Sequence, residues 1–439
     1  MKMHIYVNPP RSAWPELCRR AEQENDAAAE RVREIVARVE REGDAALRDL
    51  AERIDGVRLG SLEVSEAEFA EAGRAVSGDV KRAIEVAVRN IETFHRAQLP
   101  REVRVETLPG VVCVQRPVPI GRVGIYIPGG TAPLFSTVLM LALPARIAGC
   151  RETVMCTPCD RAGHVAAEVL YAARRCGVGR VFKTGGAQAV AAMACGTESI
   201  PRVDKIFGPG NRYVTLAKQL VSGRLVSVDL PAGPSEVMVL ADATARAEFV
   251  AADLLSQAEH GRDSQAVVVC DSAELAAAVN REVERQMQRL ERSEYVRASL
   301  AHSRAVVFGS RDGMLDFANA YAPEHLILSV RDAWEAAGRI TAAGSLFLGN
   351  YSPESAGDYA SGTNHTLPTA GWARSCSGVH VASFLRMMTL QELTREGLQS
   401  LAPAIGAMAR AEGLQAHAEA VRVRLAGGDT ENQTGGEQG

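Results

Sequence analysis

Several features that would place this chain of 439 residues in a specialised class are absent from its sequence. Aromatic residues make up only 5% of the chain, so we expect a core built from aliphatic side chains and alanine. The formal net charge of −4 gives no basic surface of the kind that binds nucleic acid, and we expect no nucleic-acid partner. With 46% hydrophobic and 23% charged residues, the composition is that of a folded protein, not a disordered one.

The sequence also lacks an apolar run long enough to cross a membrane. Its longest uncharged stretch lies between Arg122 and Arg146 and is interrupted by prolines and glycines, whereas a membrane helix needs about 20 unbroken apolar residues. We therefore expect a loop followed by a buried helix there. The N-terminus has an asparagine and two prolines where a secretory signal needs its apolar region. These features predict a soluble, cytoplasmic protein with no membrane partner.

The cysteines give no disulfide framework. There are nine, an odd number, scattered from Cys18 to Cys376, which indicates a reducing compartment. The only close pair is Cys156 and Cys159, and no second motif supports a redox or metal role for it. We interpret the cysteines as ordinary buried thiols.

The pattern of apolar residues along the chain predicts an α/β protein. Residues 1–24 contain three prolines and predict an irregular arm, and residues 25–55 and 65–97 have the apolar spacing of helices. From Val111 onward, short β-branched runs alternate with alanine-rich helical runs, a pattern typical of βαβ units with parallel sheets. Two such sets follow one another, so we expect two sheet-containing lobes. The chain then becomes helical from about residue 384 and ends in a polar, glycine-rich tail that we expect to be disordered.

Three predicted strands end in glycine-rich turns, which begin at Ile127, Lys183 and Phe207. Ligands of doubly wound sheets bind beyond the carboxyl ends of the strands, and glycine lets the backbone approach a phosphate. However, no Gly-x-Gly-x-x-Gly fingerprint follows a strand. By themselves the glycines are equally consistent with a nucleotide ligand and with simple tight turns.

Four further segments carry polar groups suited to chemistry. Gln257 and His260 are three residues apart and share a helical face, although a lone histidine there is more often a cap. Glu324 and His325 are adjacent and could serve as two proton-transfer groups, but as an isolated dipeptide they are unremarkable. The segment 350–368 is dense in serine, glycine, aspartate and histidine, as functional loops often are. Glu412 and His417 would by themselves be read as a solvated helix face.

Glutamine, histidine and aspartate side chains together form a plausible zinc set without thiolates. The candidates Gln257, His260, Asp358 and His417 are too far apart in sequence for a local finger. A metal would have to be assembled by the tertiary fold, which is typical of catalytic sites.

Taken together, these motifs closely resemble histidinol dehydrogenase, above all the segment PESAGDYASGTNH at 353–365. The resemblance extends through nearly the whole chain apart from the last dozen residues. The resembling segments are Gly121–Ala132, Thr184–Ala192, Asp204–Asn211, Asp229–Val237, Gln257–Gly261, Pro323–Leu326, Ser352–Pro368 and Glu412–His417.

The resemblance implies the zinc-dependent oxidation of L-histidinol to L-histidine by two NAD⁺, through bound L-histidinaldehyde, at the end of histidine biosynthesis. It implies one zinc per subunit and proton acceptors at Glu324 and His325. The implied zinc ligands are Gln257, His260, Asp358 and His417. The implied substrate contacts are Ser235, His365 and Glu412, together with His325 and the four metal ligands. The implied NAD⁺ contacts are Tyr126, Gln188 and Asn211.

The resemblance further implies a homodimer of chains with two incomplete Rossmann-like lobes, parallel-type sheets and small helical N- and C-terminal extensions. The expected parts are an arm at 1–24, a first domain of 25–125 with 237–380 that carries most metal and base residues, an NAD⁺-contacting domain at 126–236, a helical segment at 381–426 and a disordered tail at 427–439. The helical segment is expected to reach the partner subunit's active site.

Three alternatives remain open from the sequence. A related zinc- and NAD⁺-dependent dehydrogenase could act on another small polar alcohol, such as a dihydroxypropane sulfonate. A catalytically silent binding protein would be expected to lack Glu324 or His325, and both are present. A zinc hydrolase predicts turnover without NAD⁺.

Overall fold

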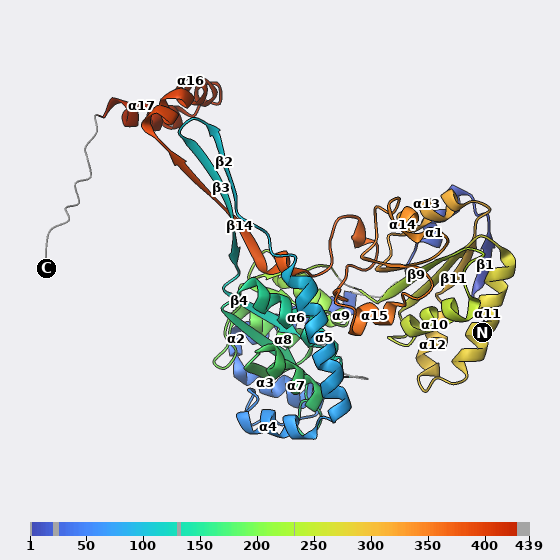
Figure 1. The fold of residues 1–439 in the computed structure, drawn as a ribbon. Helices are drawn as coiled ribbons and strands as arrows, with labels where there is room; N and C mark the ends of the chain where they lie inside the picture. The colour runs from blue at the N-terminus through green and yellow to red at the C-terminus, as the bar shows by residue number, and fades with distance from the viewer. Residues whose placement is uncertain (1, 21–25, 130–132, 232, 428–439) are drawn as a thin grey trace. The chain divides into compact units, whose positions relative to one another are not determined.

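The computed structural model describes residues 2–20, 26–129, 133–231 and 233–427 (Figure 1). The chain forms two units, of which the first comprises Met1–Leu99 and Pro119–Phe384 and the second Pro100–Val118 and Leu385–Gly439. Within the described ranges, no helix is long and apolar enough to cross a membrane. The predicted disordered tail lies outside the described residues from residue 428 onward.

One lobe of the first unit contains a six-stranded parallel sheet with the order β1-β11-β10-β9-β12-β13. Its central strands are continuous apolar runs, as expected for strands covered on both faces, and every residue of β9, β10 and β12 is buried. The strands are β1 (His4–Val7), β9 (Glu236–Ala241), β10 (Gln265–Cys270), β11 (Arg304–Val307), β12 (His325–Ser329) and β13 (Ser345–Leu348). The helices are α1 (Trp14–Leu17), α10 (Ala247–Ala258), α11 (Ala273–Met287), α12 (Ser293–Leu300), α13 (Arg311–Tyr321), α14 (Ala333–Ala337) and α15 (Glu354–Tyr359).

The other lobe contains a five-stranded parallel sheet with the order β6-β5-β4-β7-β8. Its strands are β4 (Arg122–Tyr126), β5 (Glu152–Thr157), β6 (Arg180–Lys183), β7 (Lys205–Phe207) and β8 (Ser227–Val228). Its helices include α6 (Phe135–Ala148), α7 (Ala167–Cys176), α8 (Gly186–Cys195) and α9 (Arg212–Val221). The uncharged stretch forms the buried helix α6, as predicted. When the strands of each lobe are numbered along the chain, both sheets have the order 3-2-1-4-5, with β1 added at one edge. This repeated order confirms the prediction of two Rossmann-like lobes.

The N-terminal segments differ from the prediction in two respects. The arm at 1–24 is not wholly irregular, because β1 pairs with β11 in parallel and extends the six-stranded sheet. The prediction places the helices that follow the arm in the same domain as residues 237–380. However, the apolar stripe of α2 (Asp26–Glu42), including Val32 and Val36, shares a core with Phe182 and Val190 of the five-stranded lobe. Helices α4 and α5 likewise contact α7 and α6. These helices are α2 (Asp26–Glu42), α3 (Asp44–Leu50), α4 (Glu66–Ala75) and α5 (Gly78–Arg96).

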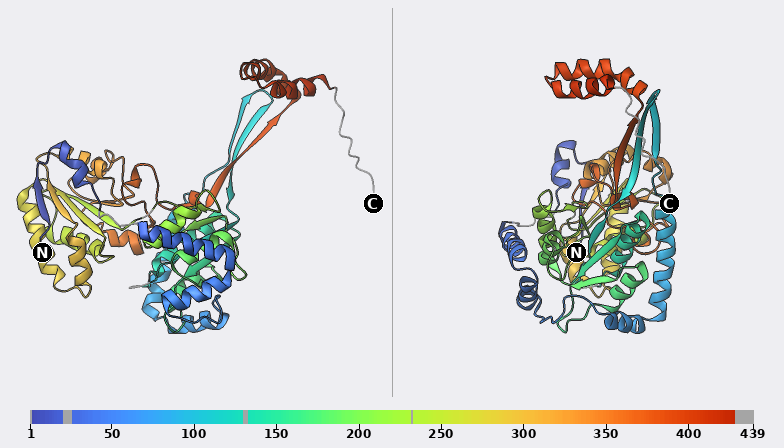
Figure 2. Two further views of the ribbon diagram at one scale, coloured as in Figure 1. Left: turned by 180° about the vertical axis from the view of Figure 1, so that it is seen from behind. Right: turned by 90° about the vertical axis from the view of Figure 1, so that its left-hand side faces the viewer.

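The second unit consists of a small sheet and a pair of helices (Figure 2). Its strands, in the order β14-β3-β2, are β2 (Val103–Leu108), β3 (Val111–Pro119) and β14 (Leu385–Leu393), and β2 pairs with β3 in antiparallel fashion. Helices α16 (Arg395–Ala411) and α17 (Gln415–Ala426) pack against each other. The prediction makes 381–426 helical throughout, whereas its first part forms strand β14. The α/β fold class is confirmed, with this sheet as an addition.

Candidate active site

The candidate site of the six-stranded lobe lies where two neighbouring strands begin. Strands β9 and β12 pair in parallel with His325 opposite Val237, so Glu324 and Glu236 are brought together at the amino ends of the strands. Gln257 is the penultimate residue of α10, which follows β9 in the chain. The glycine-rich turns of the other lobe lie instead at the carboxyl ends of strands. The two lobes therefore present their polar groups at opposite strand ends.

His325 has one ring nitrogen engaged and one free. Its Nδ1 lies 3.3 Å from the Glu236 carbonyl oxygen, which can only accept, so Nδ1 carries the proton. Its Nε2 is buried, has no hydrogen-bond partner among the described residues, and lies 3.7 Å from Asp358 Oδ1. Burial lowers the pKa of His325 to about 3. At neutral pH the ring is therefore neutral, with a lone pair on Nε2.

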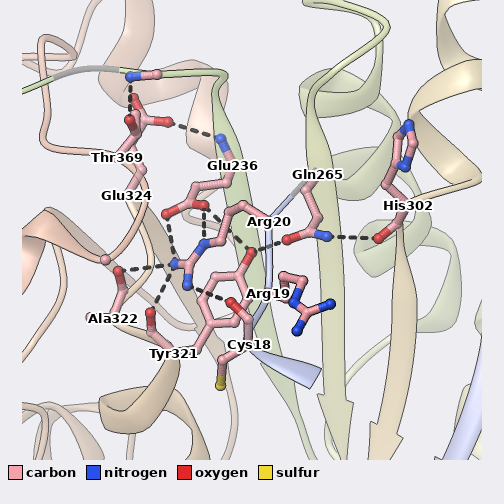
Figure 3. A network of polar contacts seen from close by, with 12 residues as sticks. Cys18, Arg19, Arg20, Glu236, Gln265, His302, Tyr321, Ala322, Glu324 and Thr369 are labelled. Atoms are coloured by element: carbon pink, nitrogen blue, oxygen red, sulfur yellow. Dashed lines mark hydrogen bonds and ion pairs between the residues drawn. The ribbon is translucent and has the colours of Figure 1, made fainter. Parts of the chain in front are cut away.

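Glu324 is held by the same backbone unit. Its Oε2 accepts a hydrogen bond of 2.9 Å from the Glu236 amide (Figure 3). The same oxygen lies 3.7 Å from His325 Nδ1. Burial raises the pKa of Glu324 well above its ordinary value, and the charges of Glu236 and Asp358 add to this effect. The carboxylate form is therefore a stronger base than an exposed glutamate.

A cluster of nitrogen and oxygen donors lies beside these two residues. One ligand atom from each of His260, Glu354 and Asp358 lies within 4.8 Å of the others. When the Gln257 amide is oriented to satisfy its neighbours, with its oxygen and nitrogen exchanged, its nitrogen donates to the Glu236 carbonyl at 3.3 Å and to Glu354 Oε1 at 3.0 Å. This orientation leaves the amide oxygen available as a ligand. Burial raises the pKa of Asp358 to about 7 and raises that of Glu354 well above its ordinary value. A cation would offset this concentration of buried carboxylates, so the donor set suits a divalent metal.

Glu354 was not singled out from the sequence, although it lies in the motif at 353–365. It begins α15, is 1% exposed, and its Oε2 has no partner in the described part of the chain. Its position directly after Pro353 gave it the appearance of a helix-start carboxylate. The only signal of another role was its spacing of four residues from Asp358, which places both on one helix face.

The remaining predicted substrate contacts divide between the two units. His365 donates from Nδ1 to the Asp358 carbonyl at 2.9 Å, and its Nε2 lies 3.3 Å from Thr137 Oγ1. Ser235 is partly buried directly before β9. Glu412 and His417 belong to the second unit and are exposed. The first unit alone thus brings together all the predicted metal and base residues except His417.

The predicted NAD⁺ contacts share one pocket of about 770 Å³ in the five-stranded lobe. Tyr126 ends β4, and its hydroxyl oxygen accepts from the Gly186 amide at 3.1 Å. Gln188 Nε2 lies 3.5 Å from Asp55 Oδ2, and Asn211 Oδ1 caps α9 by accepting from two amides of its first turn. Glycines of the first two glycine-rich turns also line the pocket, although residues 130–132 lie outside the described residues. The turns therefore border a cavity large enough for part of a dinucleotide.

Comparison with known proteins identifies the family to which this chain is similar. The family model of histidinol dehydrogenase matches residues 18–425. A histidinol dehydrogenase of Bacteroides fragilis is 54% identical over 96% of this chain and 99% of its own length. One from Escherichia coli is 52% identical over 93% of this chain and 94% of its own length. The crystal structure of histidinol dehydrogenase from Elizabethkingia anophelis superposes with a TM-score of 0.94 at 47% identity, over 97% of this chain and 98% of that one.

The chain belongs to the histidinol dehydrogenase family. Membership in the histidinol dehydrogenase family makes it an oxidoreductase, and the family match begins within the N-terminal arm and ends within α17. The match therefore includes both units.

Proposed function

We propose that this chain oxidises L-histidinol to L-histidine with two NAD⁺, at the end of histidine biosynthesis, as a cytoplasmic homodimer. The observation that carries the proposal is the unpartnered, buried Nε2 of His325, which lies 3.7 Å from Asp358 of the donor cluster, while Glu324 lies on the Nδ1 side of the same ring. A proton acceptor next to metal donors suits the oxidation of a small alcohol that also carries nitrogen ligands. The family names of the relatives point to the same substrate.

The metal in this proposal is zinc, one per subunit. Gln257, His260 and Asp358 would hold it, and the partner subunit's His417 would complete the set. When bound, zinc would supply a positive centre that orients the imidazole and amine of the substrate. Glu354 would support this set indirectly, because it accepts from the Gln257 amide nitrogen and so leaves the amide oxygen free to bind the metal.

His325 has the geometry of the first proton acceptor. In the alcohol step, the hydroxyl proton would pass to His325 Nε2 while a hydride leaves the carbinol carbon for NAD⁺. The products are an aldehyde, NADH and an imidazolium. The nearby carboxylates of Glu324 and Asp358 would stabilise that imidazolium, because opposite charges within about 4 Å favour the charged form.

Glu324 would act in the second half of the reaction. The aldehyde would stay in the site, and Glu324 would take a proton from the water that adds to its carbonyl carbon. In the same step the His325 imidazolium would return its proton to the carbonyl oxygen, which completes the hydrate and leaves His325 neutral. His325 would then accept the hydroxyl proton of the hydrate as a second hydride leaves for another NAD⁺, and the carboxylic acid remains. Ser235 and His365, with Glu412 of the partner subunit, would contact the substrate. Tyr126, Gln188 and Asn211 would contact NAD⁺ in the pocket of the other lobe.

The test is the number of NADH formed per L-histidinol consumed by the purified chain, with and without a chelator. We expect two NADH per substrate, loss of turnover with chelator and recovery with added zinc. One NADH would indicate an alcohol dehydrogenase that releases the aldehyde. No NADH from histidinol, with turnover of another small alcohol, would contradict the proposed substrate.

A further inference from the structure

Arg20, in the N-terminal arm, makes a buried contact with the strand that begins the candidate site. Its Nε and Nη2 donate to the two carboxylate oxygens of Glu236 at 2.7 and 3.0 Å. The Glu236 side chain is 1% exposed and that of Arg20 is 20% exposed. The guanidinium also lies 3.6 Å from the centre of the Tyr321 ring (Figure 3). A bidentate ion pair of this kind fixes both partners in position and orientation.

The backbone of Glu236 contacts three of the candidate site residues. Its amide donates to Glu324, and its carbonyl oxygen accepts from His325 and Gln257. A displacement of Glu236 would therefore move the hydrogen-bond partners of all three at once. The side chain of Glu236 points to Arg20 while its backbone orients the site.

Arg20 also holds the turn that leads to Glu324. Ala322 has a φ of +53°, a left-handed conformation that is strained for a non-glycine residue. Nη2 of Arg20 donates to the carbonyl of Tyr321 at 2.8 Å, directly before this strained residue. The chain then passes through Pro323 to Glu324. Arg20 thus contacts the backbone that leads to the proposed proton acceptors and the carboxylate of the residue whose backbone orients them.

We propose that Arg20 is a positioning residue that fixes Glu324 and His325 through Glu236 and the turn at Tyr321–Ala322. The inference rests on the proposed function, because it assigns Arg20 to the reaction of the same site. Arg20 contacts neither the acceptor atoms nor the donor cluster in the structure. Its effect on turnover would therefore be exerted through geometry.

The first experiment compares Arg20→Gln with wild type and with Arg19→Gln, its neighbour in the chain. The Arg19 side chain is 61% exposed and pairs with the exposed Glu16, so this control removes the same charge at the surface. We expect Arg20→Gln to lower kcat by about 100-fold, the scale of an ångström-sized misplacement. The KM for NAD⁺ should stay within about twofold, because its pocket lies in the other lobe. Arg19→Gln should behave as wild type.

A solvent deuterium isotope effect distinguishes positioning from a loss of folded protein. Slower proton transfer to displaced acceptors should raise the isotope effect on kcat above that of wild type. A smaller folded fraction would lower kcat and leave this ratio unchanged. An unchanged kcat in Arg20→Gln, or a fall with an unchanged isotope effect, would overturn the inference.

A double-variant cycle tests the route through Glu236. If Arg20 acts through this carboxylate, the double variant Arg20→Gln/Glu236→Gln should be no slower than Arg20→Gln alone. The reason is that each substitution removes the same interaction between the two side chains. Losses of kcat that multiply in the double variant would contradict the route.

A second variant applies if Arg20→Gln fails to fold. Arg20→Lys keeps the charge but loses the bidentate contact, and we expect kcat to fall by about 10-fold with a raised isotope effect. Wild type that does not oxidise histidinol would instead overturn the proposed function.

Discussion

At the scale of single residues, burial moves the pKa values of the two adjacent acceptors in opposite directions. Burial raises the pKa of Glu324 and lowers the pKa of His325 to about 3, because burial favours the uncharged form of each group. Environments that separate the pKa values of neighbouring groups are characteristic of acid–base sites. Here they make Glu324 the stronger base and leave His325 neutral, which suits two acceptors with different tasks.

The division of tasks predicts unequal effects of Glu324→Gln. Glutamine keeps an oxygen that can accept from the Glu236 amide, so the local structure should persist, but it cannot accept a proton from water. We expect oxidation of histidinaldehyde to slow by about 10²–10⁴-fold, the usual contribution of a general base, with a much smaller effect on oxidation of histidinol to the aldehyde. Single-turnover rates measured separately with the alcohol and the aldehyde would check this. Equal losses in the two half-reactions would contradict the assignment.

The sequence indicated candidate site residues more readily than the residues that support them. Glu324, His325 and Asp358 were predicted because their motifs resemble those of the family, and the structure places a carboxylate oxygen of each acid 3.7 Å from the His325 ring. Arg20 could not be found in this way, because a lone arginine in a proline-containing arm carries no local signal, and its partner Glu236 is 216 positions away. Residues that act through tertiary contacts leave no spacing pattern to read.

At the scale of secondary-structure elements, the predictable strands were those buried on both faces. Strands β9 and β10 are continuous apolar runs, so burial and sequence pattern coincide. Strand β2 is exposed along its whole length, and β1 has only four residues, none of them buried, so neither produces such a run. The packing of α2 was also missed, since an amphipathic stripe shows that a helix is covered but not by which lobe.

The junction before β13 depends on a glycine. The Gly344 amide donates to the Pro323 carbonyl at 2.9 Å, and a Cβ added to Gly344 would lie 2.5 Å from the Glu324 carbonyl oxygen. Because that atom belongs to the backbone, Gly344→Ala must displace the start of β12. We expect kcat to fall by about 10-fold or more and the free energy of unfolding to fall by about 1–3 kcal/mol. Activity assays and urea titrations would measure the two effects.

Gly338→Ala is the matched control for this junction. Gly338 lies six positions earlier with a φ of −62°, and its added Cβ would meet the Glu335 carbonyl oxygen at an ordinary 3.4 Å. We expect this variant to keep wild-type kcat within about twofold. Full activity of Gly344→Ala would show that the start of β12 can relax without disturbing Glu324.

At the scale of the whole molecule, two sheets of the same strand order carry their candidate sites at opposite strand ends. The NAD⁺ candidate pocket follows the rule for doubly wound sheets, because Tyr126 ends β4 and the glycine-rich turns follow neighbouring strands. The proton acceptors instead lie at the amino ends of β9 and β12, where α10 ends. The two lobes therefore share a strand order but not the position of their candidate sites. The rule that ligands bind at the carboxyl ends of the strands predicts only the position of the NAD⁺ candidate pocket.

The proposed homodimer with shared sites makes a prediction about mixed chains. His260 lies in the first unit and His417 in the second, and the proposal joins the His260 of one chain to the partner subunit's His417. His260→Ala and His417→Ala homodimers should both be inactive. A heterodimer would contain one site with both histidines and one site with neither. Equal mixing gives heterodimers in about half of the population, so about one quarter of wild-type activity should return.

The experiment would use two affinity tags, one on each variant, and would assay dimers purified through both. Such selected heterodimers should have about half the activity of wild type per dimer, because one of their two sites is intact. Differently tagged chains that both carry His260→Ala provide the control and should stay inactive after the same exchange. Inactive His260→Ala/His417→Ala heterodimers would mean that each site is completed within one chain, since in that arrangement both sites of the mixed dimer would lack a ligand.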